Sequence, residues 1–137
     1  MSIPDAAAPD AAPLDAAQLD AAVDALRAAG ATFAFLHGSR ADGTARGDSD
    51  VDVAAWWAAD APQSFEVLLP SGIDLLVLNH APLELAGRVA VDGVLVLETD
   101  PVARVRWVAR TRKIYFDERP RIERSHQEFA ETLRRGR

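Results

Sequence analysis

Short apolar runs bounded by turn-forming residues constrain the fold of this chain more than any other feature. They cover residues 32–37, 50–57, 73–78 and 94–98. Each run is too short for an ordinary helix and long enough for a strand. The sequence therefore predicts four strands. The apolar flanks of the run at 73–78 predict a central position in the sheet for that strand.

Helical signals alternate with these runs. Leu19, Ala22 and Leu26 recur at helical spacing, with Asp15 as a suitable N-cap and Gly30 as a suitable stop. Further helices are expected over 82–92, from 101 to the residue before Pro120, and from there to 135. Residues 65–69 fit either a short strand or one helical turn. This order of elements predicts an α/β or α+β sandwich around a small sheet.

The length of 137 residues suits one domain. Residues 1–13 hold mainly Ala, Pro and Asp, so we expect a disordered arm there and a single domain over 14–137. Cys is absent, which excludes disulfides and thiolate chemistry and is typical of a reducing compartment. No apolar run approaches the ~18 residues of a membrane span, and no secretory signal pattern is present. We therefore expect a cytoplasmic protein without membrane contact.

The charge is distributed unevenly along the chain. Residues 1–100 hold 4 basic and 16 acidic side chains, whereas residues 101–137 hold 11 basic and 5 acidic ones. A dedicated nucleic-acid binder needs a broad basic face, so we expect no direct nucleic-acid binding. An acidic body suits a protein that binds divalent cations. The basic end suits either a solvated helix with internal ion pairs or a contact with phosphate or an acidic partner.

The stretch 36–54 combines two features that are chemically complementary. Gly38 and Ser39 follow a strand, where free backbone N–H groups and a hydroxyl can hold a phosphate oxygen. Asp50 and Asp52 lie two residues apart on a strand and so share one face of the sheet. Two carboxylates this close repel each other unless a cation lies between them, and Mg²⁺ prefers such oxygen ligands together with substrate phosphates. This pairing indicates phosphoryl or nucleotidyl transfer.

Asp74 supplies a third carboxylate inside an otherwise apolar strand. A buried, unpaired carboxylate is costly, so this position needs a functional or structural partner. If its strand lies beside that of Asp52, Asp74 can join the metal site or take the proton of an attacking hydroxyl. Taken singly, these residues suit ordinary turns, strand edges or ion pairs, and His37 suits a packed, hydrogen-bonded strand end. Their combination favours catalysis.

These residues resemble the signature of the polymerase-β-type nucleotidyltransferase superfamily. The pattern is Gly38-Ser39, ten further residues, then Asp50-Val51-Asp52, with Asp74 in the place of the third carboxylate. The fuller form, with Arg40 and Ala41 after the serine, is similar to the minimal nucleotidyltransferases (MNT proteins). The resemblance covers residues 14–120.

The resemblance implies a nucleotidyltransferase fold of the α/β (α+β) class, with a small mixed sheet flanked by helices. It implies two Mg²⁺ ions and a nucleoside triphosphate, usually ATP. Gly38, Ser39 and Arg40 would then bind the nucleotide, although Arg40 fits an ion pair with an Asp equally well. Asp50, Asp52 and Asp74 would ligate metal and carry catalysis, with Asp74 alternatively acting as the base.

The resemblance also implies a partner. Many minimal members are antitoxins paired with a helical HEPN ribonuclease toxin, which they neutralise by transferring AMP to a tyrosine. We therefore expect a protein adenylyltransferase that acts as an antitoxin. Two alternatives stay open: a small-molecule nucleotidyltransferase of the aminoglycoside-modifying kind, and a non-catalytic antitoxin that acts by binding alone. Residues 59–71 depart from the family, because they leave room for a reduced helix or an extra strand where a full helix is usual.

Overall fold

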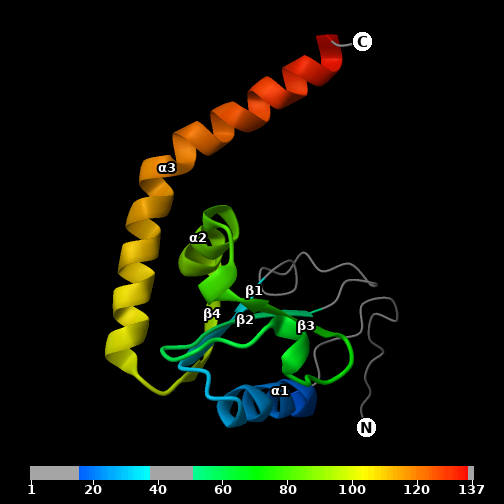
Figure 1. Ribbon diagram of the computed structural model, residues 1–137, viewed down its shortest axis with the longest axis vertical. Coiled ribbons are helices and arrows are strands. Elements are labelled where there is room, and N and C mark those ends of the chain that lie inside the picture. Colours follow the sequence, from blue (N-terminus) through cyan, green and yellow to red (C-terminus); the bar gives the residue numbers. More distant parts are fainter. Residues whose placement is uncertain (1–15, 38–50, 136–137) are drawn as a thin grey trace, which may run out of the picture.

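Four strands form one sheet with helices on both faces (Figure 1). The computed structural model describes residues 16–37 and 51–135. Its elements are α1 (Ala16–Ala28), β1 (Phe33–His37), β2 (Val51–Trp56), the 3₁₀ turn η1 (Ser64–Glu66), β3 (Ile73–Val77), the 3₁₀ turn η2 (Leu78–His80), α2 (Leu83–Asp92), β4 (Val94–Glu98) and α3 (Pro101–Arg135). This architecture confirms the predicted α/β class. The expected arm at 1–13 and the N-cap at Asp15 lie outside the described residues.

The sheet is mixed and has the order β3-β2-β1-β4. β1 pairs antiparallel with β2 and β4, and β2 pairs parallel with β3. The predicted central position of the third strand is wrong, because β3 lies at the edge of this sheet. Its apolar sequence has another cause. Ile73 and Val77 contact the core on one face, whereas Leu76 contacts the core on the other.

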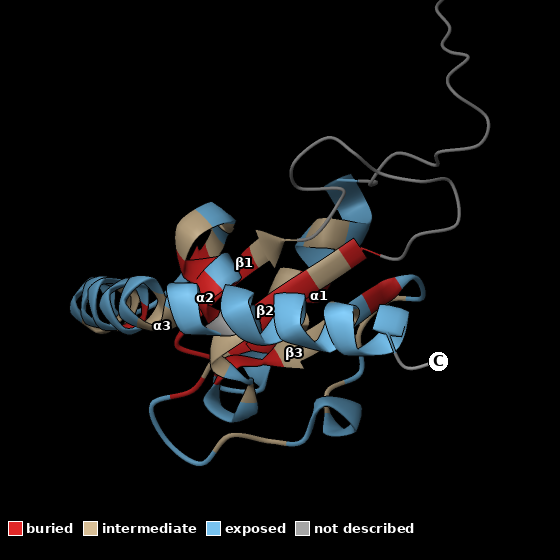
Figure 2. Ribbon diagram, turned by 90° about the horizontal axis from the view of Figure 1, so that it is seen from above, coloured by how far each residue is buried: buried red, intermediate tan, exposed pale blue. Residues whose placement is uncertain are grey.

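The two faces of the sheet carry separate cores. On one face, Ala22 and Leu26 of α1 pack against Val53 and Ala55 of β2. On the other face, Val89 of α2 and Trp107 of α3 cover Phe33, Phe35, Ala54 and Leu78. Figure 2 shows that burial is concentrated in the strands and that the outward sides of the helices are exposed. Strand residues alternate between the faces, so the face that each side chain occupies follows from its position along the strand.

Helix α1 ends as the sequence predicts. Gly30 has a positive φ of 90°, a conformation that glycine adopts without steric cost. The N–H of Ala31 bonds the carbonyl of Leu26, and the N–H of Gly30 bonds that of Arg27, both at 3.0 Å. These two bonds are the Schellman pattern and leave the chain in position to enter β1.

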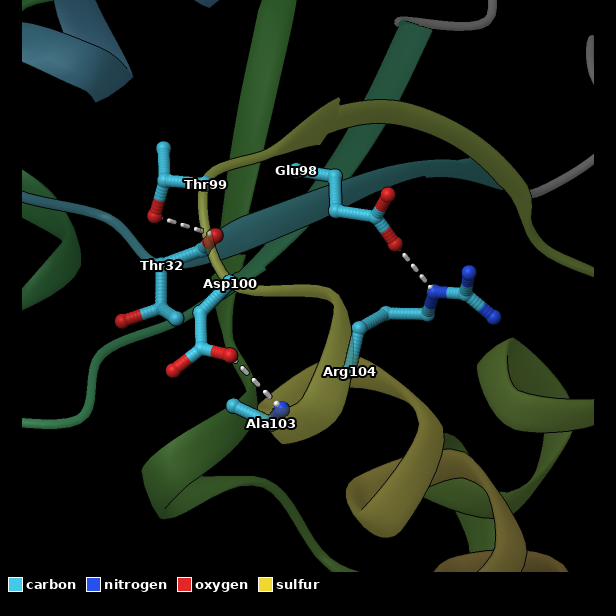
Figure 3. A network of polar contacts seen from close by, with 6 residues as sticks. All are labelled: Thr32, Glu98, Thr99, Asp100, Ala103 and Arg104. Carbon is cyan, nitrogen blue, oxygen red and sulfur yellow. Dashed lines mark hydrogen bonds and ion pairs between the residues drawn. The ribbon is translucent and has the colours of Figure 1, made fainter.

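The connection from β4 to α3 is fixed by side chains (Figure 3). The Thr99 hydroxyl donates to the carbonyl of Thr32 at 2.9 Å. The Asp100 carboxylate accepts from the N–H of Ala103 at 3.1 Å and caps the helix. Arg104 pairs with Glu98 at 2.6 Å. Together these contacts hold the start of α3 against the end of the sheet.

Helix α3 is continuous from Pro101 to Arg135, with Pro120 inside it. The prediction that Pro120 separates two helices is therefore wrong. Proline removes one backbone hydrogen bond and crowds the preceding turn, and this bends a helix without always ending it. Figure 1 shows α3 changing direction in its orange part, after which it extends away from the sheet. No helix in the described part of the chain is long and apolar enough to span a membrane.

The segment between β2 and β3 contains the single 3₁₀ turn η1 and no strand. Its start is held by the N–H of Gln63, which donates to the Glu66 carboxylate at 2.7 Å. Of the two alternatives for 59–71, the reduced helix is the one observed. Phe65 and Leu68 consequently point into solvent, with 80% and 89% of their surface exposed.

Candidate active site

His37, Asp52 and Asp74 form a row across three neighbouring strands. His37 of β1 is the register partner of Asp52 of β2, and Asp52 is the register partner of Asp74 of β3. Neighbouring strands lie about 4.8 Å apart, so each residue of the row adjoins the next. All three side chains fall on the face covered by α2 and α3, because they alternate with residues that pack on α1. The row lies at one end of the sheet.

The two carboxylates of the row differ in exposure. Asp52 is half-buried and Asp74 is exposed. Asp74 also lines a cavity of about 380 Å³ together with Phe65 and Leu68 of the loop that precedes β3. Two carboxylates in register on one face repel each other, and a cation bound between them removes that repulsion. Their oxygen atoms are the ligands that Mg²⁺ prefers, so this pair fits that ion.

His37 lies beside Asp52 with one ring nitrogen enclosed. Its Nε2 is buried and has no hydrogen-bond partner within the described residues. This atom therefore does not make the hydrogen bond that was expected of a strand-end histidine. Burial lowers the pKa of His37 below 6.5, Asp52 raises it, and Arg88 lowers it further. The net effect favours the neutral imidazole.

Sequence reasoning missed Arg88. This exposed residue of α2 lies close enough to lower the pKa of His37. It therefore brings a positive charge to the helical side of the row. One signal was available, because Arg88 is one of only four basic residues among the first 100.

The remaining predicted site residues are Gly38, Ser39, Arg40 and Asp50, and they lie outside the described residues. Within the described ranges, no three of the His, Asp and Glu side chains are grouped so as to hold a metal. The predicted metal site has three carboxylates, and its third one, Asp50, is not among the described residues. The placement of Asp52 and Asp74 on one face is thus observed, and the roles of all the predicted residues stay predictions.

A family profile decides the classification. The profile described as "Polymerase beta, Nucleotidyltransferase" matches residues 27–102, which is more than half of the chain. The chain belongs to the polymerase β nucleotidyltransferase family. The matched range includes the first signature motif and both described carboxylates. No curated protein matches the sequence at a significant level.

Solved structures share the nucleotidyltransferase fold seen here. A chain of a toxin–antitoxin crystal structure with AMP-PNP is 21% identical, with a TM-score of 0.60, covering 79% of this chain and 98% of that one. A chain of the MntA–HepT complex is 18% identical, with a TM-score of 0.56, covering 82% and 99%. A chain of the complex between the tri-AMPylated Shewanella oneidensis HEPN toxin and its MNT antitoxin is 19% identical, with a TM-score of 0.55, covering 80% and 97%.

Proposed function

We propose that this protein is a Mg²⁺-dependent adenylyltransferase that transfers AMP from ATP to a hydroxyl of a partner protein. The observation that carries the proposal is the in-register pair of Asp52 and Asp74 in a chain of the nucleotidyltransferase family. The partner we propose is a HEPN-type toxin, which the transfer would neutralise. Structures of similar fold support this choice, because one contains AMP-PNP and another contains a tri-AMPylated HEPN toxin with its MNT antitoxin.

In this reaction the acceptor enters at Asp74, which is the exposed end of the row. The acceptor hydroxyl approaches Asp74, whose carboxylate takes the proton as the oxygen attacks the α-phosphorus of ATP. The new bond joins that oxygen to the α-phosphorus. The bond between the α-phosphorus and the oxygen that bridges it to the β-phosphorus breaks, and pyrophosphate leaves. Arg88 and the predicted backbone cradle at Gly38 and Ser39 bind the negative charge of the triphosphate.

Asp52 and the predicted Asp50 would hold the metal, and Asp74 would complete the site through one carboxylate oxygen and take the proton with the other. Bound Mg²⁺ neutralises the triphosphate and stabilises the charge on the leaving group. Asp52 is suited to a fixed ligand because it is half-buried between β1 and β3. The neighbouring His37 is the register partner of Asp52, and burial favours its neutral imidazole, so it adds no second positive charge beside this ligand.

Partner labelling tests the proposal. The protein is incubated with Mg²⁺, ATP labelled on the α-phosphate, and a HEPN-type partner encoded beside its gene. We expect label on the partner, and a loss of at least about a hundredfold in rate for Asp52→Asn and for Asp74→Asn, as for other groups that stabilise transition-state charge. Asp20→Asn is the matched control, because Asp20 is an exposed carboxylate on α1, across the sheet.

Two results would show that an alternative function is correct instead. Neutralisation of the partner that survives Asp52→Asn combined with Asp74→Asn would show an antitoxin that acts by binding alone. Pyrophosphate release that depends on an aminoglycoside, with no label on the partner, would show a small-molecule enzyme. Equal labelling by the wild type and both carboxylate variants would remove the row from catalysis altogether.

A further inference from the structure

A second cavity lies further along the same face of the sheet. It has a volume of about 510 Å³ and lies between the sheet and the first half of α3. The residues that line it include Trp56, Leu78, Arg106, Trp107, Arg110 and Ile114. We call it the arginine groove, because two arginines lie on its α3 side above an apolar floor.

The floor of the arginine groove is aromatic and packs on the core. The Trp56 ring stacks on buried Phe33 with centroids 5.2 Å apart and an interplanar angle of 13°. The Trp107 ring lies 5.6 Å from the same phenylalanine. Asn79 also lines the groove, but its amide accepts from the N–H of Trp57 at 3.0 Å and donates to the Trp57 carbonyl at 2.7 Å. That amide is thus already engaged and is poorly placed to read the edge of a nucleotide base.

The two arginines of the groove have no partner within the described part of the chain. The other basic residues of 101–121 each make a contact: Arg104 with Glu98, Arg112 with the Ala90 carbonyl, Lys113 with Asp117, Arg119 with Glu123, and Arg121 with Glu118. Arg106 and Arg110 are exposed and lie four residues apart, so they project from the same side of α3. This side of the helix therefore carries two unneutralised guanidinium groups.

We infer that the arginine groove docks an acidic segment of a protein partner. Its carboxylates would pair with Arg106 and Arg110, and an apolar side chain would cover the tryptophan floor. Guanidinium groups bind carboxylates through two parallel hydrogen bonds, which orients the bound segment. The two guanidinium groups suit carboxylates and the tryptophan floor suits an apolar side chain, and we therefore favour a peptide over a nucleotide, for which the engaged Asn79 amide offers no base-edge contact.

The position of the groove suits delivery of an acceptor. Trp56 follows Asp52 by four residues on the same face of β2, which corresponds to about 13 Å along a strand. A partner held at the groove needs only a few extended residues to bring a hydroxyl to the carboxylate row. This role rests on the proposed function, whereas binding of an acidic peptide does not.

Peptide titration followed by NMR tests the inference on the full chain. The probe is a short synthetic peptide of alternating glutamate and leucine, compared at millimolar concentration with its lysine–leucine counterpart and with ATP. We expect the acidic peptide to shift the indole N–H signals of Trp56 and Trp107, and the other two probes to leave them in place. Arg106→Glu with Arg110→Glu should abolish the shifts. The matched control is Arg124→Glu with Arg134→Glu, which makes the same charge change further along α3 and should preserve them.

Four results would overturn the inference. The first is that the acidic peptide causes no indole shift, and the second is that ATP causes equal shifts. The third is that both pairs of variants lose the shifts equally. The fourth is that deleting residues 1–13 itself shifts the indole signals, which would make the acidic arm of this chain the occupant. A failure of the proposed function has a different signature. In that case the peptide still binds to the groove, but no partner protein is labelled. If instead the groove does not dock the partner, Arg106→Glu combined with Arg110→Glu leaves the labelling of the partner unchanged.

Discussion

Asp52 and Asp74 are register partners in the parallel pair of β2 and β3, so two carboxylates 22 positions apart in sequence are neighbours on one face of the sheet. The loop that separates their strands contains a single 3₁₀ turn. Because β3 is an edge strand and Asp74 is exposed, an acceptor from another molecule can reach this carboxylate.

The stability of the protein should depend on pH through His37. Its folded-state pKa lies below 6.5, with Asp52 and Arg88 as the charged groups that act on it. The unfolded chain therefore takes up the proton first as the pH falls below 6.5, and the free energy of unfolding decreases in that range. His37→Leu should reduce this loss between pH 7.5 and 5.5 in urea unfolding with EDTA present. His80→Gln, at an exposed histidine, should retain the full loss, and an unchanged loss in His37→Leu would contradict the assignment.

Gly87 sets the distance between α2 and α3. A Cβ at this position would lie 2.7 Å from the Tyr115 Cβ and closer still to its ring. Overpacking of this kind costs about 1–3 kcal/mol, whereas alanine gains about 1 kcal/mol in helix propensity. We expect Gly87→Ala to lower the free energy of unfolding by up to about 2 kcal/mol, which is the cost less the gain. In a double-mutant cycle Tyr115→Ala should relieve much of this cost, and strictly additive effects would show that the clash is not the cause.

We attribute the bend of α3 to Pro120, which lies inside the helix. Pro120→Ala supplies the N–H that can bond the carbonyl of Phe116, and alanine in a helix interior is favoured over proline by about 3 kcal/mol. We expect slower amide exchange over residues 117–124. The midpoint of global unfolding should change little, because the described side chains beyond Pro120 are almost all exposed. Unchanged exchange in this segment would assign the bend to packing rather than to proline.

Much of the fold could be predicted because its signals are local. The Gly30 stop and the alternation along β2 each depend on a few adjacent residues, and both are observed. The edge position of β3 could not be predicted, because it depends on pairing between distant segments. Its apolar sequence fits a strand covered on both faces as well as it fits a central strand.

The candidate site also has features that the sequence predicts and features that it does not. Strand alternation predicts which face each carboxylate occupies, but only the parallel register of β2 and β3 makes Asp52 and Asp74 neighbours. The burial of His37 Nε2 depends on tertiary packing, and the approach of Arg88 depends on how α2 packs across the sheet. Such packing has no sequence signature of its own.

Paramagnetic broadening by Mn²⁺ in the presence of ATP tests the central claim most directly. Mn²⁺ takes the oxygen ligands of Mg²⁺ and broadens the NMR signals of nearby residues. The account predicts broadening of the Asp52 and Asp74 amide signals with sparing of Asp20 across the sheet, and loss of the effect in Asp52→Asn. Broadening that is centred elsewhere, or that persists unchanged in Asp52→Asn combined with Asp74→Asn, would contradict it.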